Sequence, residues 1–136
     1  MPAVLIDAGP LVAILDSSDD WHHRCRDAFR TLTEPPRTLW PVLTEACYLL
    51  RSSHRAQSTL LQFVESEAIT IAHLGLDDVA RIRELMRKYS DLPMDLADAA
   101  IVRVAEREKI HSVFTIDRRD FQTYRPAGIG RFRLFP

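Results

Sequence analysis

Apolar and polar residues follow two different patterns along the chain. Short apolar or β-branched runs between polar residues are typical of strands, whereas apolar residues at i, i+3, i+4 and i+7 are typical of helices with one buried face. The first pattern predicts strands over residues 3–6, 38–40, 68–72, 112–117 and 131–135. The second predicts helices over residues 11–15, 21–32, 41–53, 55–67, 76–89 and 95–109, with a further short helix after Asp117.

Strands and helices alternate from one end of the chain to the other. This order predicts an α/β fold with three layers, in which helices cover both faces of a central, mainly parallel sheet. Residues 131–135 alternate between polar and apolar side chains, so we expect them at the edge of the sheet. A length of 136 residues suits one core, and no repeat or linker divides the chain, so we expect a single domain over residues 1–136.

Composition is that of an ordinary globular protein. Hydrophobic residues make up 46% and charged residues 27%, and no apolar run is long enough to cross a bilayer. The first residues lack the basic segment and long apolar run of a secretory signal, so we expect a cytoplasmic protein with no membrane partner. Cys25 and Cys47 are too far apart for a C-x-x-C motif, which argues against a sulfur-based metal site.

The charged residues are balanced in number but unusual in kind. A net charge of −1 argues against nucleic-acid binding by bulk attraction alone. All basic residues except Lys88 and Lys109 are arginines, whose planar side chains suit bidentate contacts with phosphate. The candidates for such contacts are Arg51, Arg55, Arg118 and Arg119. The alternative for each of them is an ordinary solvated position on the surface.

Four acidic residues stand at strand ends or beside apolar helix faces. Asp7 and Asp117 stand at the carboxyl ends of predicted strands, whereas Glu45 and Asp98 lie near the starts of helices. Ligands of open α/β folds bind at the edge formed by the carboxyl ends of the strands, so we expect all four acids to converge there. The alternative for Glu45 is a structural salt bridge to an arginine.

Helix capping is a second explanation for the aspartates. Asp7 precedes a helix, where a carboxylate can accept hydrogen bonds from the first free N–H groups. Asp95 and Asp98 have the D-x-x-D spacing of a capping box, and Asp117 and Asp120 repeat it. Each pair taken alone is explained by capping, and it is the combination with the rest of the chain that favours a site.

A cluster of carboxylates requires a compensating cation. Crowded like charges raise one another's pKa and cost stability unless a positive charge neutralises them. Oxygen ligands without cysteine or a histidine pair favour Mg²⁺ or Mn²⁺, and such ions commonly take substrate phosphates as further ligands. The sequence therefore predicts metal-assisted hydrolysis of a phosphodiester.

Four segments of the chain resemble the PIN-domain ribonucleases, and in particular the small VapC-type toxins. The segments are VLIDAGPLVAILD, TEACYLL, MDLADAAIVRVAE and FTIDRRDFQTYR, which together extend over nearly the whole length. The resemblance implies a PIN-like fold. It also implies acidic metal-binding residues at Asp7, Glu45, Asp98 and Asp117, an additional acid at Asp95 and a polar site residue at Thr115.

The resemblance further implies an activity and partners. The expected activity is Mg²⁺- or Mn²⁺-dependent cleavage of RNA, with Asp7 and Asp98 as central metal ligands, Glu45 and Asp117 completing the site and Asp95 supporting it. Arg118 and Arg119, beside the last acid, are expected to contact substrate phosphates together with Thr115. The expected partners are an RNA substrate, a cognate antitoxin protein and a second copy of the chain.

Other functions fit the sequence less well. A haloacid-dehalogenase-type phosphatase needs a second aspartate where this chain has Gly9, and a phospho-accepting receiver domain needs a lysine where it has Arg118. The remaining alternative is a non-catalytic module of the same fold that only binds RNA or a protein. The complete acidic set argues against that module, because unneutralised carboxylates repel RNA.

Overall fold

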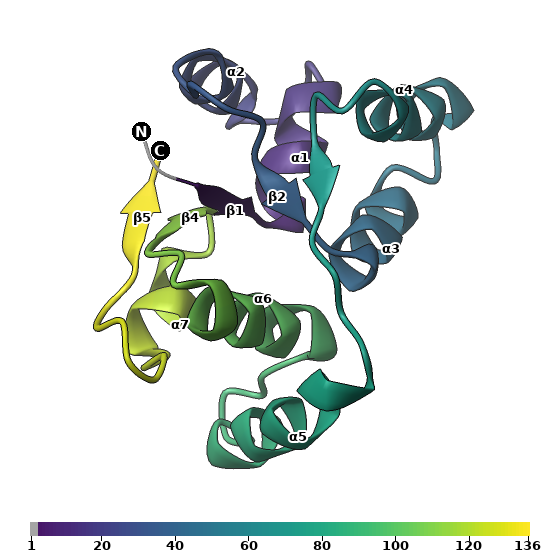
Figure 1. The fold of residues 1–136 in the computed structure, drawn as a ribbon. Coiled ribbons are helices and arrows are strands. Elements are labelled where there is room, and N and C mark those ends of the chain that lie inside the picture. The colour runs from purple at the N-terminus through teal and green to yellow at the C-terminus, as the bar shows by residue number, and fades with distance from the viewer. Residues whose placement is uncertain (1–2) are drawn as a thin grey trace.

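The computed structural model describes residues 3–136. Five short strands form one sheet in the order β3-β2-β1-β4-β5, and each neighbouring pair is parallel (Figure 1). The prediction of a parallel α/β sheet is confirmed, and the last strand lies at an edge. The strands are β1 (Val4–Ile6), β2 (Arg37–Thr38), β3 (Thr70–Ile71), β4 (Ser112–Phe114) and β5 (Arg133–Phe135).

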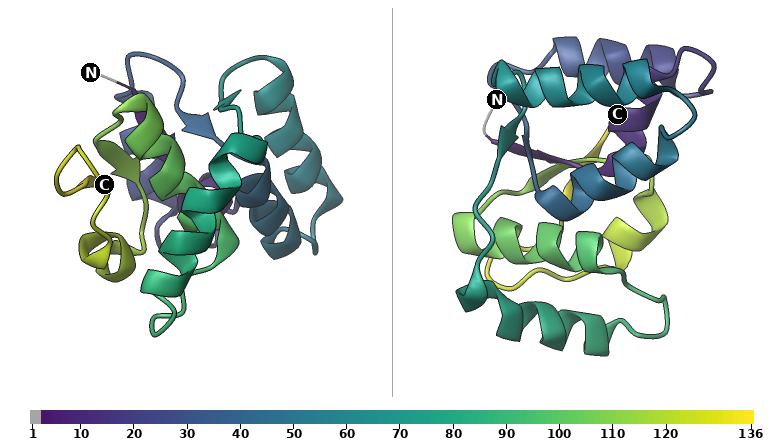
Figure 2. Two further views of the ribbon diagram at one scale, coloured as in Figure 1. Left: turned by 60° about the horizontal axis from the view of Figure 1, so that its bottom comes forward. Right: turned by 90° about the vertical axis from the view of Figure 1, so that its right-hand side faces the viewer.

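Helices cover both faces of the sheet, which confirms the predicted three layers. In Figure 1, α1, α2 and α4 lie above the sheet, and α5, α6 and α7 lie below it. The second panel of Figure 2 shows α3 between these groups, where it packs against α1 and α6. The helices are α1 (Ala8–Leu15), α2 (His22–Arg30), α3 (Trp40–Leu49), α4 (His54–Glu65), the 3-10 turn η1 (Leu76–Asp78), α5 (Val79–Lys88), α6 (Leu96–Glu108) and α7 (Arg118–Thr123).

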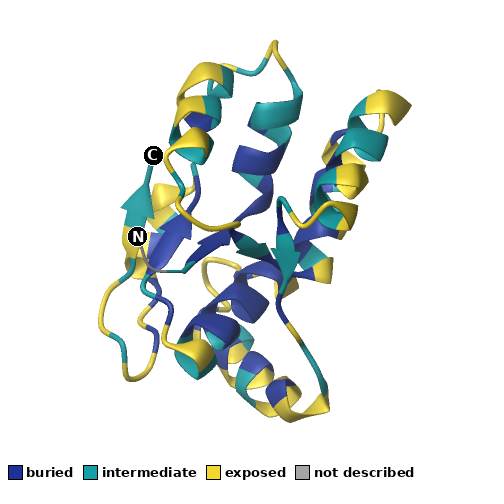
Figure 3. Cartoon of the chain, turned by 45° about the horizontal axis from the view of Figure 1, so that its top comes forward, coloured by how far each residue is buried: buried dark blue, intermediate teal, exposed yellow. Residues whose placement is uncertain are grey.

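The core occupies both faces of the central strands, against α1 on one side and α6 on the other. All residues of β1 and β4 are buried, and Figure 3 shows these strands as the buried centre of the molecule. Residues 97–102 of α6 are buried without interruption, so this helix is enclosed on almost every side. Apolar side chains buried in this way each stabilise the fold by roughly 1.5–3 kcal/mol. Every helix in residues 3–136 is too short or too polar to traverse a bilayer.

The boundaries of some elements differ from the prediction by a few residues. Residues 38–40 were expected to form a strand, but β2 ends at Thr38 and Trp40 already belongs to α3. Leu39 keeps an extended backbone as the residue that precedes this helix, which explains the strand-like pattern. Pro41 is accordingly the second helical residue and not the first, a position where its missing N–H is also harmless.

The first helix packs unusually close to the sheet at Gly9. A Cβ atom at this position would lie 2.7 Å from Cγ1 of Ile116, which is closer than side-chain atoms can approach. The helix was predicted to begin at residue 11, but α1 begins at Ala8 and includes Gly9. The absence of a side chain at Gly9 lets the start of α1 pack directly against the side chain of Ile116, which lies between Thr115 and Asp117.

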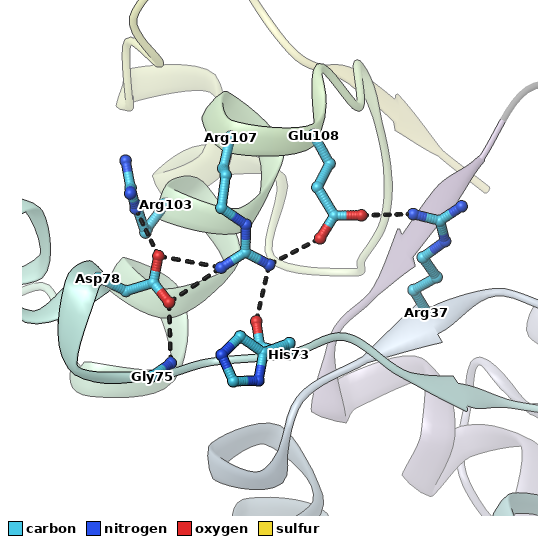
Figure 4. Close-up of polar contacts among 7 residues, drawn as sticks. All are labelled: Arg37, His73, Gly75, Asp78, Arg103, Arg107 and Glu108. Carbon is cyan, nitrogen blue, oxygen red and sulfur yellow. Dashed lines mark hydrogen bonds and ion pairs between the residues drawn. The ribbon is translucent and has the colours of Figure 1, made fainter.

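Asp78 connects the segment before α5 to α6. Its side chain is 2% exposed and accepts hydrogen bonds from the Gly75 N–H at 2.9 Å, from Arg103 Nε at 2.8 Å and from Arg107 at 2.9 Å (Figure 4). Burial by itself would raise the pKa of this carboxyl. The hydrogen bonds and the two guanidinium charges outweigh burial and lower its pKa to about 2.

The same network continues to the sheet. Arg107 also donates to the carbonyl oxygen of His73 at 2.7 Å and to Glu108 at 2.7 Å. Glu108 in turn pairs with Arg37 of β2 at 2.6 Å (Figure 4). The end of α6 is therefore tied both to the segment that crosses from β3 and to the sheet itself, which holds the long helix in place beneath the central strands.

Replacement of Asp78 by asparagine should lower the free energy of unfolding at neutral pH by about 3 kcal/mol, because two arginines lose a buried partner. In the wild type, the contribution of this carboxylate should be complete above its ordinary pKa of 3.8 and be lost as the pH falls toward 2. Urea unfolding between neutral pH and about pH 2.5 measures both effects. The control is Asp77→Asn, at an exposed neighbour, which should change little. An Asp78→Asn variant as stable as the wild type at neutral pH would contradict the assignment.

Candidate active site

The order of the strands reverses between β1 and β4. The chain passes from β1 outward to β2 and β3, then crosses to β4 and continues outward to β5. Asp7 directly follows β1, and Thr115 and Asp117 follow β4. Open α/β folds bind ligands at such a switch point, outside the carboxyl ends of the strands. The structure therefore brings together the two strand ends at which the sequence predicted acidic residues.

Asp7, Thr115 and Asp117 are joined by hydrogen bonds. Oδ1 of Asp7 accepts from the Ala8 N–H at 2.9 Å, and Oδ2 accepts from the Thr115 hydroxyl at 3.0 Å. The Thr115 oxygen accepts in turn from the Asp117 N–H at 3.0 Å. Burial of Asp7 raises its pKa to about 6, although these hydrogen bonds oppose the change, and the charges of Asp117 and Asp95 raise it further.

Asp98 enters the same region from α6. It is 9% exposed, and its Oδ2 accepts a hydrogen bond from the Tyr124 hydroxyl at 2.7 Å. Burial raises the pKa of Asp98 to about 8, against the effect of the Tyr124 hydrogen bond. The charges of Asp7, Asp95 and Asp117 raise it in addition, which indicates that the predicted acids lie close enough to repel one another.

Asp95, at the start of α6, and Glu45, in α3, complete the group of acids. Asp95 is exposed and caps α6, where its Oδ1 accepts from the Asp98 N–H at 2.8 Å. Glu45 was expected in a core-facing position of its helix, but it is only half-buried, and the buried residues of α3 are Val42, Leu43 and Ala46. Burial, followed by the charges of Asp7, Asp95 and Asp117, raises the pKa of Glu45.

Asp120 was not predicted as a site residue. Asp98, Asp117 and Asp120 each contribute one carboxylate oxygen to a group of three oxygens that lie within 4.8 Å of one another. Burial and the charge of Asp117 raise the pKa of Asp120. The D-x-x-D spacing from Asp117 was interpreted as a capping box, and the Asp120 N–H does lie 3.5 Å from Asp117 Oδ1. The same spacing places both carboxylates on one face of a helix, which was the available signal.

Tyr124 was also missed. It lies within residues 122–130, whose two glycines and one proline are typical of a loop, and nothing in the local pattern connects it with Asp98. The structure places it at the end of α7, fully buried, against that carboxylate. Contacts between residues 26 positions apart cannot be read from periodicity.

None of these acids forms an ion pair within residues 3–136, although the charge of Arg119 opposes the rise in the pKa of Asp120. In residues 3–136, the ion pairs of the arginines involve other acids, such as Asp78, Glu106 and Glu108. The alternative of a structural salt bridge for Glu45 is therefore excluded. A set of oxygen donors at a partly open position, with no cation from the protein, suits a divalent ion such as Mg²⁺ or Mn²⁺.

The alternative explanation, that the aspartates cap helices, is also observed in the structure. Asp7, Asp95 and Asp117 each accept a hydrogen bond at the start of a helix. A carboxylate has two oxygens with two lone pairs each, so a capping hydrogen bond leaves further acceptor positions for a cation. Capping and metal binding are thus compatible in this arrangement.

The predicted substrate-binding residues differ in accessibility. Thr115 is 0% exposed, so its hydroxyl contacts Asp7 and Asp117 and presents no surface to a substrate. Arg118 is exposed but donates toward the carbonyl oxygens of Leu134 and Pro136. Arg119 is exposed on the first turn of α7 beside Asp120.

An open cavity of about 700 Å³ adjoins the acids on the side of α3. Glu45 and Asp95 are part of its wall, and the exposed rings of Trp40 and Tyr48 form another part. The guanidinium of Arg51 lies over the Tyr48 ring at 4.1 Å. The acidic group is therefore accessible to a large ligand from this direction.

The family model of the PIN domain matches residues 4–125. Ribonuclease VapC26 of Mycobacterium tuberculosis is 28% identical over 135 residues, which cover 98% of this chain and 100% of that protein. The crystal structure of Mycobacterium tuberculosis VapC20, described as a toxin that cleaves the sarcin-ricin loop, has a TM-score of 0.78 at 18% identity and covers 85% of this chain and 91% of that chain.

Two further solved structures share the fold. VapBC2 from Rickettsia felis, bound to a DNA fragment from its promoter, has a TM-score of 0.68 at 12% identity and covers 99% of this chain and 100% of that chain. A toxin-antitoxin complex from Klebsiella pneumoniae has a TM-score of 0.65 at 20% identity, and the match covers 94% of this chain and 92% of that chain. The family-model match extends over most of the chain and agrees with the sheet order and the acidic site, and the protein therefore belongs to the PIN-domain family.

Proposed function

We propose that this PIN-domain protein is a metal-dependent endoribonuclease and the toxin of a toxin-antitoxin pair. The main observation is the convergence of acids from β1, α3, α6 and the end of β4 without a basic partner. Membership of the family and similarity to a ribonuclease over almost the full length support the same activity.

We assign the metal-binding role to the acids as a group. Asp7 and Asp98 are the central ligands, because they are the most buried of these acids and burial is the main cause of their raised pKa values. Glu45 and Asp117 complete the set, and Asp95 supports it. Asp120 joins the predicted acids, since its carboxylate shares the space between Asp98 and Asp117.

The reaction assigned to this site is hydrolysis of an RNA phosphodiester. A bound Mg²⁺ or Mn²⁺ ion would lower the pKa of a coordinated water and stabilise negative charge on the phosphate. The protein residues fix the geometry, because hydrogen bonds from Thr115 and Tyr124 hold the two central carboxylates. We therefore assign Thr115 to the positioning of Asp7 and not to direct substrate contact.

Phosphate contacts are assigned to the arginines of α7. Arg119 is exposed on the first turn of α7, where the N-terminus of the helix also favours anions. Arg118 would have to leave the carbonyl groups of the C-terminal strand to reach a substrate. Arg119 is therefore the stronger candidate.

The partners remain predictions. The solved structures of similar fold include toxin-antitoxin complexes, which supports a cognate antitoxin for this chain. We also propose a homodimer, in keeping with the apolar side chains of Trp40, Tyr48, Leu49 and Leu96 that are exposed on α3 and at the start of α6. A cytoplasmic location likewise remains a prediction.

Replacement of Asp7 or Asp98 by asparagine should reduce metal-dependent RNA cleavage by at least ~100-fold, because the loss of a charged ligand removes several kcal/mol of charge stabilisation. The measurement is single-turnover cleavage of a mixed RNA pool by the purified protein with Mn²⁺. Asp77→Asn, which removes an exposed acid outside the site, is the control and should retain full activity. A variant that keeps wild-type cleavage would remove that residue from the catalytic set.

The metal-free protein should lose stability as the pH rises. A carboxyl whose pKa is raised contributes stability below its ordinary value of 3.8, and this contribution is lost as the pH passes about 6 for Asp7 and about 8 for Asp98. The melting temperature in EDTA should therefore fall from pH 5 to pH 9, and Mn²⁺ should raise it again. The Asp98→Asn variant should melt higher than the wild type in EDTA at pH 8 and respond less to Mn²⁺. A melting temperature insensitive to Mn²⁺ would favour the non-catalytic binding module.

A further inference from the structure

Tyr124 is the only residue outside the acidic group whose side chain donates a hydrogen bond to Asp98 in the part of the chain that the structure describes. We propose that Tyr124 is a positioning residue, whose hydroxyl holds the Asp98 carboxylate in the orientation that binds the divalent ion. This inference rests on the metal-dependent function proposed above. It gives a role to a residue that lies in the segment FTIDRRDFQTYR but that the sequence analysis did not assign to the site.

The ring of Tyr124 is fixed in place by packing. It is 0% exposed and lies between two other aromatic rings. Its centroid is 5.1 Å from that of Tyr89 and 5.2 Å from that of Phe121, both in edge-to-face arrangements. Such pairs stabilise a packed cluster beyond the burial of their area. The hydroxyl is therefore held at one position relative to α6.

The backbone that carries Tyr124 is fixed as well. The N–H of Arg125 donates to the Tyr89 hydroxyl oxygen at 2.7 Å, which ties the residue after Tyr124 to the end of α5. The N–H of Ala127 donates to Glu106 of α6 at 2.7 Å. Glu106 is itself held by Arg81 through contacts of 2.9 and 2.8 Å. The segment after α7 is thus attached to both helices beneath the sheet.

The hydrogen bond selects one carboxylate orientation. Oδ2 of Asp98 accepts from the phenol, which leaves Oδ1 as the oxygen with no hydrogen bond from another side chain. Without the phenol, repulsion from Asp7 and Asp95 would favour rotation of the carboxylate away from the group. A phenol also keeps its proton at neutral pH and remains a donor when the carboxylate is charged.

The other central acid is held in a similar way. Oδ2 of Asp7 accepts from the buried hydroxyl of Thr115, just as Oδ2 of Asp98 accepts from the buried hydroxyl of Tyr124. Hydrogen-bond partners of metal ligands orient those ligands, and their loss typically weakens metal binding by roughly 10- to 100-fold. The two hydroxyls therefore act as a matched pair behind the two central carboxylates.

The test is the Tyr124→Phe variant, which keeps the ring and removes only the hydroxyl. Calorimetric titration of EDTA-treated protein with Mn²⁺ should show binding weakened by about 10-fold or more. The matched control is Tyr89→Phe, since this residue lies in the same aromatic cluster but its hydroxyl contacts a backbone N–H and no acid. Tyr89→Phe should leave the Mn²⁺ affinity within about twofold of the wild type.

A second readout separates positioning from general stability. Melting temperatures in EDTA report the effect of each variant on the fold, and cleavage rates over a range of Mn²⁺ concentrations report the metal affinity during reaction. The rate of Tyr124→Phe should approach that of the wild type as Mn²⁺ saturates, whereas a purely structural defect would appear as a lower melting temperature in EDTA. Unchanged Mn²⁺ affinity in Tyr124→Phe, or equally weakened Mn²⁺ affinity in Tyr124→Phe and Tyr89→Phe, would overturn the role of Tyr124 and leave the proposed function intact. A wild-type protein that binds no Mn²⁺ would overturn the proposed function as well.

Discussion

The position of negative charge at the starts of helices is the constraint on which the acidic site depends. Asp7 precedes α1, Asp95 and Asp98 lie at the start of α6, and Asp117 precedes α7. The N-terminus of a helix has free N–H groups and a partial positive charge, both of which stabilise carboxylates. This stabilisation offsets part of the repulsion between the acids. The fold can therefore hold them together before a cation binds.

The distribution of arginines along α6 reinforces this arrangement. Arg103 and Arg107 lie toward the carboxyl end of the helix and pair with Asp78. Positive charge is stabilised at this end because the helix dipole is negative there. At the opposite end, Asp95 and Asp98 have no basic partner within residues 3–136. One helix thus has one end whose acids and arginines form ion pairs and an opposite end whose acids form none within residues 3–136. Sites that conflict with local stability in this way are characteristic of function.

Stability and function share the same side chains at the centre of the site. Asp7 both starts α1 and points an oxygen at the Thr115 hydroxyl, which also accepts from the backbone after β4. The Thr115 hydroxyl therefore links the Asp7 carboxylate, at the end of β1, to the backbone that follows β4. The buried ring of Tyr124 gives Asp98 a comparable support from α7. Rigid supports of this kind are what a metal site requires to keep its geometry.

The sequence by itself determined the fold class, the order of the elements and most of the acidic set, because these follow from periodicity and from the chain direction in parallel sheets. Only the tertiary structure decided which side chains support that set. Asp120 looked like a cap, Thr115 like a surface contact and Tyr124 like part of a loop, whereas each contacts or adjoins a predicted acid. The contacts of Thr115 and Tyr124 join residues far apart in the chain, so they depend on how β1, β4, α6 and α7 pack, and only Asp120 had a local signal, its spacing from Asp117.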